Sequence, residues 1–211
     1  QENFSPAYVV VGANYTFGFQ GKGDSAFLQK MGEDYGFISR IGGSVLRDGQ
    51  MVSSTRIRSL IAAGDLAHVN EYLQWPLDYA GVVTYGEQRG RTLGFPTANI
   101  ALDDAYALLP NGVYAVRVHF DGAVYMGVAN IGSNPTFEEV ERRIEVHILQ
   151  FGGDLYGKKI RLDFLGKLRD EKRFSGVDAL IEQIHCDIEQ AHRFWDIPVQ
   201  AGRLPHGEKQ G

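Results

Sequence analysis

The fold is decided by the stretch Val113-Tyr-Ala-Val-Arg-Val-His-Phe120, Asp121-Gly122, Ala123-Val-Tyr-Met-Gly-Val128. Two runs rich in β-branched and aromatic residues flank an Asp-Gly dipeptide. Such a dipeptide favours a two-residue hairpin turn, because aspartate and glycine tolerate the positive φ angles that this turn requires. The stretch therefore predicts a β-hairpin in the second half of the chain.

Short alternating runs of the same kind lie on both sides of this hairpin. The strand-like runs are Tyr79–Tyr85, Gly112–His119, Val124–Ile131, Ile144–Leu149 and Lys159–Phe164. Five or six such strands followed by one helix predict a small closed or nearly closed antiparallel barrel.

The segment after the last strand has the periodicity of an amphipathic helix. We expect Ser175 to cap it and its apolar stripe to pack on the barrel. The stripe consists of Val177, Leu180, Ile181, Ile184, Ile188, Ala191 and Trp195. Residues 196–211 are polar and are expected to form a flexible tail.

The first part of the chain has a different pattern, in which strands and helices mix. A short apolar strand is expected at Tyr8–Val11, a helix at Phe27–Tyr35, and two short capped helices at Arg56–Ala63 and Asp65–Leu73. Pro76 marks the expected boundary, so residues 1–76 form an α/β part and residues 77–195 a β part. A parallel sheet around the first strand would lack neighbours, so the α/β part is expected to be incomplete.

Composition narrows the class of protein. The 211 residues include 26 acidic and 21 basic residues, for a net charge of −5, which argues against a dedicated nucleic-acid binder. The single cysteine, Cys186, excludes an intrachain disulfide and fits a reducing cytosol. No apolar run is long enough for a membrane span, so a cytoplasmic enzyme with small-molecule substrates is expected. The oligomeric state stays open.

The stretch Arg89-Gly-Arg-Thr-Leu-Gly-Phe-Pro-Thr-Ala-Asn99 has the residue types of a loop that binds polyphosphate and a divalent cation. Gly90 and Gly94 let the backbone approach an anion closely, and Pro96 restricts the chain. Thr97 and Asn99 supply hard oxygen ligands. A plain glycine-rich turn between strands is the alternative.

A second candidate lies on a strand, in Ile144-Glu-Val-His-Ile148. The apolar residues share one face, so Glu145 and His147 share the other. A carboxylate presented in this way can act as a general base. The alternative for Glu145 is a solvated surface position, and His147 is interpreted as a surface or supporting residue.

The order of motifs resembles one known family. The motifs are Arg89–Ile100, Leu109–Val116, Gly127–Phe137, Ile144–Leu149, Asp154–Gly157 and Leu168–Phe174, preceded by Val9–Gly18 and Val52–Arg58. Together they are similar to the bacterial FAD synthetase family of bifunctional riboflavin kinase/FMN adenylyltransferases. The resemblance implies a partial Rossmann-like nucleotidyltransferase module followed by a Greek-key β-barrel of the riboflavin kinase kind.

The resemblance also implies roles for individual residues of the kinase part. Glu145 would be the general base, and Thr97 and Asn99 would hold Mg²⁺ against ATP. Gly90, Arg91, Gly94 and Pro96 would contact the nucleotide. Arg169 and Phe174 would fold over the flavin, although Phe174 is equally a core anchor for the helix. The substrates would be riboflavin and ATP, and the products FMN and ADP.

For the adenylyltransferase part, the resemblance assigns ATP or flavin contacts to Asn14, Ser54, Thr55 and Arg58. Helix capping and a turn asparagine are the alternatives. The His-x-Gly-His element of that module does not occur among the six histidines. We therefore expect this chain to make FMN but not FAD, whereas the full-length protein would make both. A non-catalytic flavin-binding regulator is the rival hypothesis.

Overall fold

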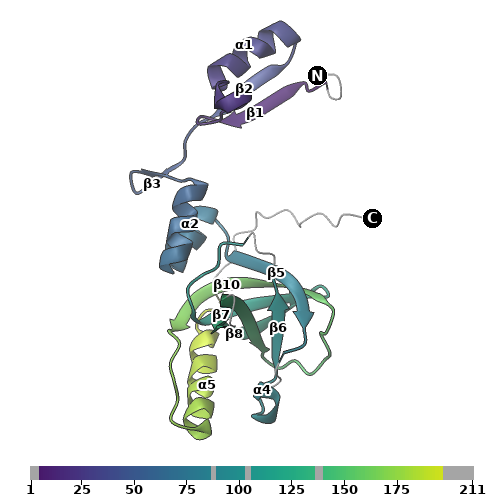
Figure 1. Ribbon diagram of the computed structural model, residues 1–211, viewed down its shortest axis with the longest axis vertical. Helices are drawn as coiled ribbons and strands as arrows, with labels where there is room; N and C mark the ends of the chain where they lie inside the picture. Colours follow the sequence, from purple (N-terminus) through teal and green to yellow (C-terminus); the bar gives the residue numbers. More distant parts are fainter. Residues whose placement is uncertain (1–4, 87–88, 103–105, 136–139, 197–211) are drawn as a thin grey trace. The chain divides into compact units, whose positions relative to one another are not determined.

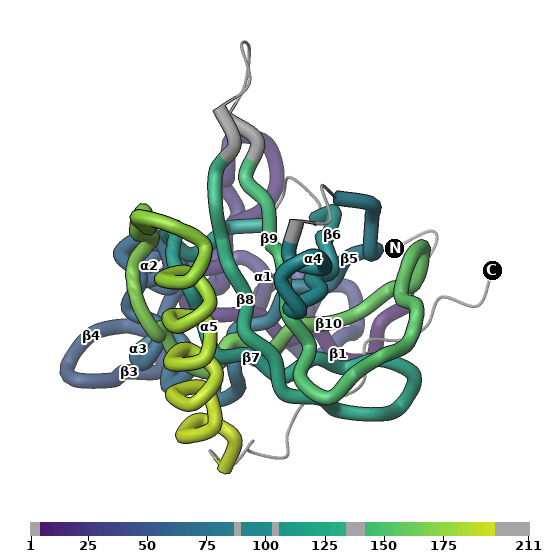
Figure 2. Tube along the Cα trace, turned by 90° about the horizontal axis from the view of Figure 1, so that it is seen from below, coloured from purple at the N-terminus to yellow at the C-terminus, as the bar shows by residue number. Residues whose placement is uncertain are grey.

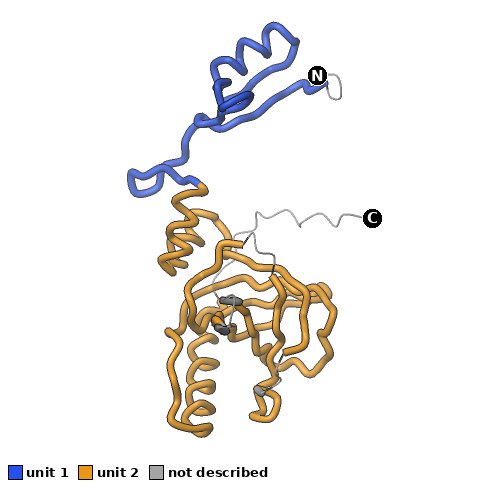
Figure 3. Tube along the Cα trace, viewed as in Figure 1, with its two compact units in different colours: residues 1–53 blue, residues 54–211 orange. Residues whose placement is uncertain are grey.

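The computed structural model describes residues 5–86, 89–102, 106–135 and 140–196. These residues belong to two compact units, residues 1–53 and residues 54–211, which are coloured separately in Figure 3. Each unit is described by itself. The helices that precede the barrel belong to the second unit, whereas the sequence predicts a boundary at residue 76. The division of the chain into functional domains stays a prediction.

The first unit contains a β-α-β arrangement. Strands β1 (Tyr8–Gly12) and β2 (Ile38–Gly42) are parallel, and helix α1 (Ser25–Tyr35) connects them and contacts β2. Asp24 caps this helix by accepting a hydrogen bond from the Phe27 amide at 2.8 Å. The smaller elements of the unit are the 3-10 turn η1 (Phe19–Gly21) and the two-residue strands β3 (Leu46–Arg47) and β4 (Gln50–Met51).

The second unit is built on a closed antiparallel barrel (Figure 1). Its strands are β5 (Leu77–Thr84), β6 (Thr97–Ala101), β7 (Gly112–Phe120), β8 (Ala123–Pro135), β9 (Val140–Ile148) and β10 (Lys159–Arg169). The strand order is β10-β5-β6-β9-β8-β7. Because β10 returns to lie beside β7 after the β7-β8-β9 meander, the topology is the expected Greek key.

The predicted hairpin is present between β7 and β8. Asp121 and Gly122 have φ angles of 51° and 75°, as a type I′ turn requires. Phe120 pairs with Ala123 across the turn, and the register runs unbroken to Gly112 and Ile131.

The barrel interior is filled by alternate residues of every strand. Tyr79, Tyr114 and Phe164 are the largest fully buried side chains, and their rings meet edge to face. Both phenols are satisfied: Tyr79 donates to the Ala107 carbonyl and accepts from the Leu109 amide, and Tyr114 donates to the Pro110 carbonyl. Burial raises the pKa of both tyrosines, that of Tyr114 to about 12.

Two short helices, α2 (Ser54–Ala63) and α3 (Leu66–Leu73), add to the barrel core. Val69 of α3 is completely buried in it. Asn70 joins α3 to two strands, since its amide donates to the Phe164 carbonyl at 3.0 Å and its oxygen accepts from the Leu77 amide at 2.7 Å. These helices therefore close part of the barrel.

Helix α5 (Val177–His192) lies along the outside of the barrel, beside β7 and β8 (Figure 2). It covers a small second core on the outer face, formed by Ala115, Met126, Leu165 and Ala191. The predicted cap was wrong by one residue: the N-cap is Gly176, without a side-chain hydrogen bond, rather than Ser175. Of the expected apolar stripe, Ala191 is buried, Val177 and Trp195 at its ends are exposed, and the residues between Val177 and Ala191 are half-buried.

Candidate active site

The expected loop at residues 89–99 is in fact a short helix, a turn and a strand. Helix α4 spans Arg89–Thr92, and β6 begins at Thr97. Thr97 and Asn99 therefore lie on a strand rather than on a flexible loop. Because they are two residues apart, both side chains point to the same face of the sheet.

The neighbouring strand brings Glu145 to that face. In the β6–β9 register, Asn99 lies opposite Glu145 and Thr97 lies opposite His147. Directly opposed residues in an antiparallel pair have Cβ atoms about 4.5–5.5 Å apart. Glu145 is half-buried, so its carboxylate is partly shielded and still accessible.

The side chains between these positions point the other way. Ile144 and Val146 are fully buried and Ile100 nearly so, all within the barrel core. Thr97, Asn99, Glu145 and His147 consequently lie on the outer face of the barrel. The three side chains that the sequence assigned to metal binding and proton transfer thus share one surface.

A glycine that the sequence analysis missed leaves room for Asn99. A Cβ atom at Gly86 would lie 2.0 Å from Asn99 Nδ2, so no larger residue fits there while Asn99 keeps its position. No periodic pattern marks this requirement, because Gly86 and Asn99 come together only through the β5–β6 pairing.

The turn before β6 is closed by its own backbone. The carbonyl of Gly90 accepts hydrogen bonds from the amides of Leu93 and Phe95 at 3.1 and 2.9 Å, and Gly94 donates to the Arg91 carbonyl at 3.3 Å. These three amides therefore do not provide the expected phosphate cradle. Gly94 has a φ angle of 86°, and a Cβ at Gly90 would lie 2.3 Å from the Phe95 carbonyl oxygen, so both glycines are needed for the turn.

A cavity of about 560 Å³ adjoins this turn. Its volume suits a nucleotide-sized ligand. Its lining comprises Arg91, Pro96 and Thr97, the segment from Phe151 to Tyr156, and four residues of the barrel core or packed against it, Val83, Ala98, Val146 and Ile148. Thr97 thus belongs both to the cavity and to the face that carries Glu145.

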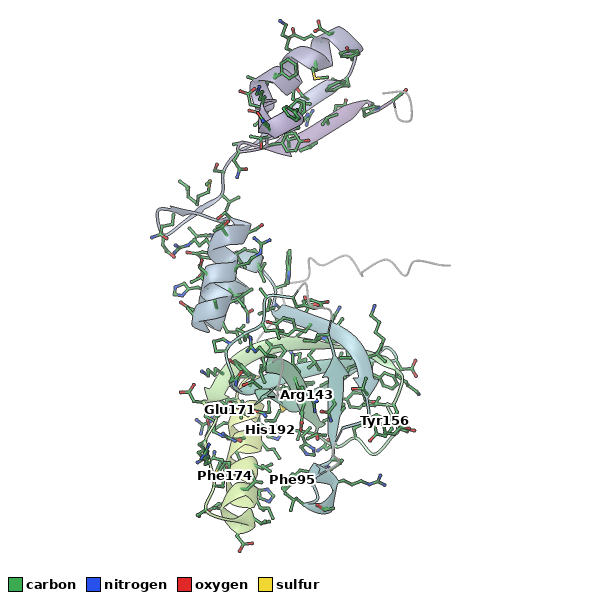
Figure 4. The ribbon with its side chains drawn as sticks, in the orientation of Figure 1. Phe95, Arg143, Tyr156, Glu171, Phe174 and His192 are labelled. Atoms are coloured by element: carbon green, nitrogen blue, oxygen red, sulfur yellow. The ribbon has the colours of Figure 1, made fainter. Side chains whose placement is uncertain are left out.

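The segment from Phe151 to Tyr156 is a part of the cavity lining that the sequence analysis left without a role. Asp154 fixes its turn by accepting from the Tyr156 amide at 3.0 Å. The ring of Tyr156 stacks on Tyr85, with centroids 3.9 Å apart. Figure 4 shows Tyr156 on the side of the barrel away from Phe174 and helix α5. The Asp154-Leu-Tyr-Gly157 motif was the available signal.

Arg169 is held by helix α5. Its Nε lies 2.9 and 3.0 Å from the two carboxylate oxygens of Asp187, and its Nη2 donates to the same group at 2.9 Å. Asp187 is 2% exposed. The Arg169 guanidinium also lies over the Phe174 ring, 5.6 Å from its centroid. The two residues expected near the flavin are therefore in contact, and their role in flavin binding stays a prediction.

The residues expected in the adenylyltransferase part lie in different units. Asn14 is exposed in the turn after β1. Ser54 and Thr55 form the first turn of α2 rather than preceding it, and Arg58 is exposed on the same helix. Their nucleotide contacts stay predictions.

The donor set at Thr97 and Asn99 fits Mg²⁺. This ion prefers hard oxygens and takes only one or two ligands from the protein, with water and substrate phosphates completing its shell. A hydroxyl and an amide oxygen on one face, next to a nucleotide-sized cavity, meet this requirement. Clusters of three or more His, Cys, Asp or Glu are absent from the part of the chain that the structure describes, so no alternative centre of that kind competes there.

The second unit thus combines a closed Greek-key barrel, a Thr-x-Asn strand paired with the strand that carries Glu145, and a cavity next to Thr97. The riboflavin kinase family model matches residues 73–195, and the chain therefore belongs to the riboflavin kinase family. An FAD synthetase model matches residues 1–56.

Curated relatives are named as bifunctional enzymes, with one part of the name for each of the two family models. The chain is 36% identical over 195 residues to the bifunctional riboflavin kinase/FMN adenylyltransferase of Bacillus subtilis, which covers 89% of this chain and 60% of the relative. It is 40% identical over 185 residues to that of Pseudomonas fluorescens, covering 87% and 59%. The chain thus spans about 60% of the length of these relatives.

A solved structure agrees over most of the chain. It is described as a macrolide-efflux protein from Streptococcus pneumoniae and is 35% identical, with a TM-score of 0.78 over 88% of this chain and 60% of that one. In the described part of this chain, no helix is both long and apolar enough to cross a membrane.

Proposed function

We propose that this chain is a riboflavin kinase that transfers the γ-phosphoryl group of ATP to the 5′-hydroxyl of riboflavin, giving FMN and ADP. The observation that carries this proposal is the register of β6 and β9, which sets Glu145 opposite Asn99 and next to Thr97. Family membership and the names of the relatives support the choice of substrates.

In this proposal, Glu145 accepts the proton of the ribityl hydroxyl as its oxygen attacks the γ-phosphorus. The bond from that phosphorus to the β,γ-bridging oxygen breaks, and ADP leaves. The hydroxyl is a weak nucleophile, so a positioned base is needed as the new bond forms. The half-buried position of Glu145 on a strand, not on a loop, holds it in a fixed direction.

Thr97 and Asn99 would hold Mg²⁺. When bound, this ion would neutralise charge on the transferred phosphoryl group. The cavity beside Thr97 would take the nucleotide, with Arg91 near its phosphates and Tyr156 as another lining residue. The flavin would lie on the outer face, toward the segment that carries Arg169 and Phe174. Most of the rate acceleration would come from this positioning.

For the whole protein, we propose a second activity, the adenylylation of FMN to FAD. The match of the FAD synthetase model to residues 1–56 supports it. The His-x-Gly-His element is absent from this sequence, so this chain is expected to stop at FMN. A cytoplasmic location fits these substrates.

The proposal is tested by incubating the purified chain with riboflavin, ATP and Mg²⁺ and separating the flavins by chromatography. Formation of FMN alone is expected. Formation of FAD as well would refute the expectation drawn from the missing histidines. Tight riboflavin binding without any product would instead favour the non-catalytic flavin-binding regulator.

A further inference from the structure

His147 makes a directional contact with the residue that precedes Thr97. Its Nδ1 lies 2.8 Å from the carbonyl oxygen of Pro96. A carbonyl oxygen can only accept a hydrogen bond, so Nδ1 must carry the hydrogen. This contact requires an imidazole with a hydrogen on Nδ1 and ties β9 to the backbone at the start of β6.

The same imidazole also packs against Phe95. The two ring centroids are 5.5 Å apart, with the planes at 79°. Phe95 also meets His185 of helix α5, with ring centroids 5.3 Å apart and planes at 77°. Both arrangements are edge to face, the geometry that aromatic pairs prefer. Figure 4 shows the labelled Phe95 next to α4, so the contact joins the turn before β6 to the outer helix.

These contacts fix two consecutive residues of the chain just before Thr97. Pro96 has a restricted φ angle of its own, and its carbonyl is held by His147. The Phe95 amide also donates to Gly90, so an anchored Phe95 fixes the turn that carries Arg91. Both Arg91 and Thr97 line the cavity.

We propose that His147 is a positioning residue for the nucleotide-binding turn: through the Pro96 carbonyl and the Phe95 ring, it sets the direction of Thr97 and Arg91. The inference rests on the proposed function, because it assumes that the cavity takes ATP. The role requires a donor at Nδ1 and needs no proton transfer from the imidazole.

A long-range ¹H–¹⁵N NMR spectrum of the labelled protein tests the hydrogen bond directly. A proton on Nδ1 of His147 is expected, and replacement of His147 identifies the signal. A bare Nδ1 with the proton on Nε2 alone would overturn the proposal. This result does not depend on catalysis.

Three substitutions then separate the hydrogen bond from general packing. His147→Asn places an amide donor near the position of Nδ1, His147→Gln places one near Nε2, and His147→Phe keeps a ring without a donor. Loss of one hydrogen bond predicts that the Gln and Phe variants raise the KM for ATP by roughly five- to tenfold. The Asn variant restores the donor but lacks the ring that packs on Phe95, so its KM for ATP is expected to lie between those of wild type and the Phe variant. Riboflavin affinity is expected to be unchanged in all three.

His119→Asn is the matched control. This histidine also lies on a strand and makes one close contact, to Asp163 at 2.7 Å, but its strands are β7 and β10. It should leave the KM for ATP unchanged. The proposal is wrong, and the residue only structural, if His147→Phe raises the KM for ATP and the KM for riboflavin equally. The same holds if His147→Asn raises the KM for ATP as much as His147→Phe does.

The affinity for Mg-ADP, measured by calorimetry, tests the role of His147 without requiring that the protein phosphorylate riboflavin. If wild type binds Mg-ADP but does not phosphorylate riboflavin, the kinase proposal fails while the comparison of ADP affinities still decides the role of His147. If ADP affinity is the same in wild type and His147→Phe, the positioning role is refuted even in an active kinase.

Discussion

Glu145 of β9 and Asn99 of β6 are cross-strand partners on the outer face of the barrel. One residue belongs to the proposed proton transfer and the other to the proposed metal site. Their spacing is set by the antiparallel ladder, which keeps the two groups in register without a mobile loop between them. Because the ladder holds the pair, single side chains can be changed without moving the backbone.

Glu145→Gln is expected to lower kcat for FMN formation by about 100-fold or more, because an amide cannot accept the hydroxyl proton. The KM for ATP should change little, since the substitution leaves the cavity intact. Steady-state kinetics with separate titrations of riboflavin and ATP measure both values. Glu182→Gln, an exposed site on α5, is the control. Near-normal turnover in Glu145→Gln would remove Glu145 from the mechanism.

Gly86→Ala is expected to reduce activity on the order of tenfold or more, because the new Cβ would displace the Asn99 side chain by about an ångström. Raising the Mg²⁺ concentration should restore part of the activity if Asn99 binds the ion. Gly43→Ala is the control, since a Cβ there meets no atom within 4 Å. Full activity of Gly86→Ala at low Mg²⁺ would show that the position of Asn99 is unimportant.

Asp187→Asn is expected to lower the free energy of unfolding by about 2 to 4 kcal/mol, because it leaves the Arg169 guanidinium without its buried counter-charge. Denaturant unfolding measures the change. Asp170→Asn removes the partner of Lys167, but this carboxylate is 85% exposed, so a loss below about 1 kcal/mol is expected. Equal effects of the two substitutions would contradict the structural importance of the Arg169–Asp187 pair.

The buried tyrosines predict a loss of stability at high pH. The pKa of Tyr114 is raised to about 12 in the folded protein, whereas the unfolded chain ionises near the ordinary value of 10.0. The unfolded state therefore loses its proton first, and the free energy of unfolding falls as the pH rises from about 10 to 12. In Tyr114→Phe, the fall should be shallower over this interval. Denaturant titrations at several alkaline pH values measure it, and parallel curves for both proteins would refute the prediction.

Much of the barrel could be predicted from local patterns. The Asp121-Gly122 turn, the alternation in its flanking strands and the helical period after Ser175 each depend on neighbouring residues. Strand β6 was missed because it is only five residues long and follows Gly94 and Pro96, which favour a turn. Its alternation is also weak, since small Ala98 is one of its inward-facing residues.

The candidate site was predictable only in part. Thr97, Asn99 and Glu145 were selected through their motifs and family resemblance, and the register of β6 and β9 places them on one face of the sheet. Their roles in metal binding and proton transfer stay predictions. The sequence did not predict three contacts: Gly86 against Asn99, the buried Asp187 against Arg169, and Phe95 against two histidines. Each joins residues that are distant in sequence, and nothing local in the chain marks such pairs.

The sequence by itself determined most of the secondary structure, the hairpin turn and the chemical character of the site residues, because periodicity and side-chain chemistry act over a few neighbouring positions. Only the tertiary structure decided which groups meet. Closure of the barrel sets the register between β6 and β9, and this register depends on how the whole interior packs. Asn99 faces Glu145, and Thr97 faces His147, for that reason.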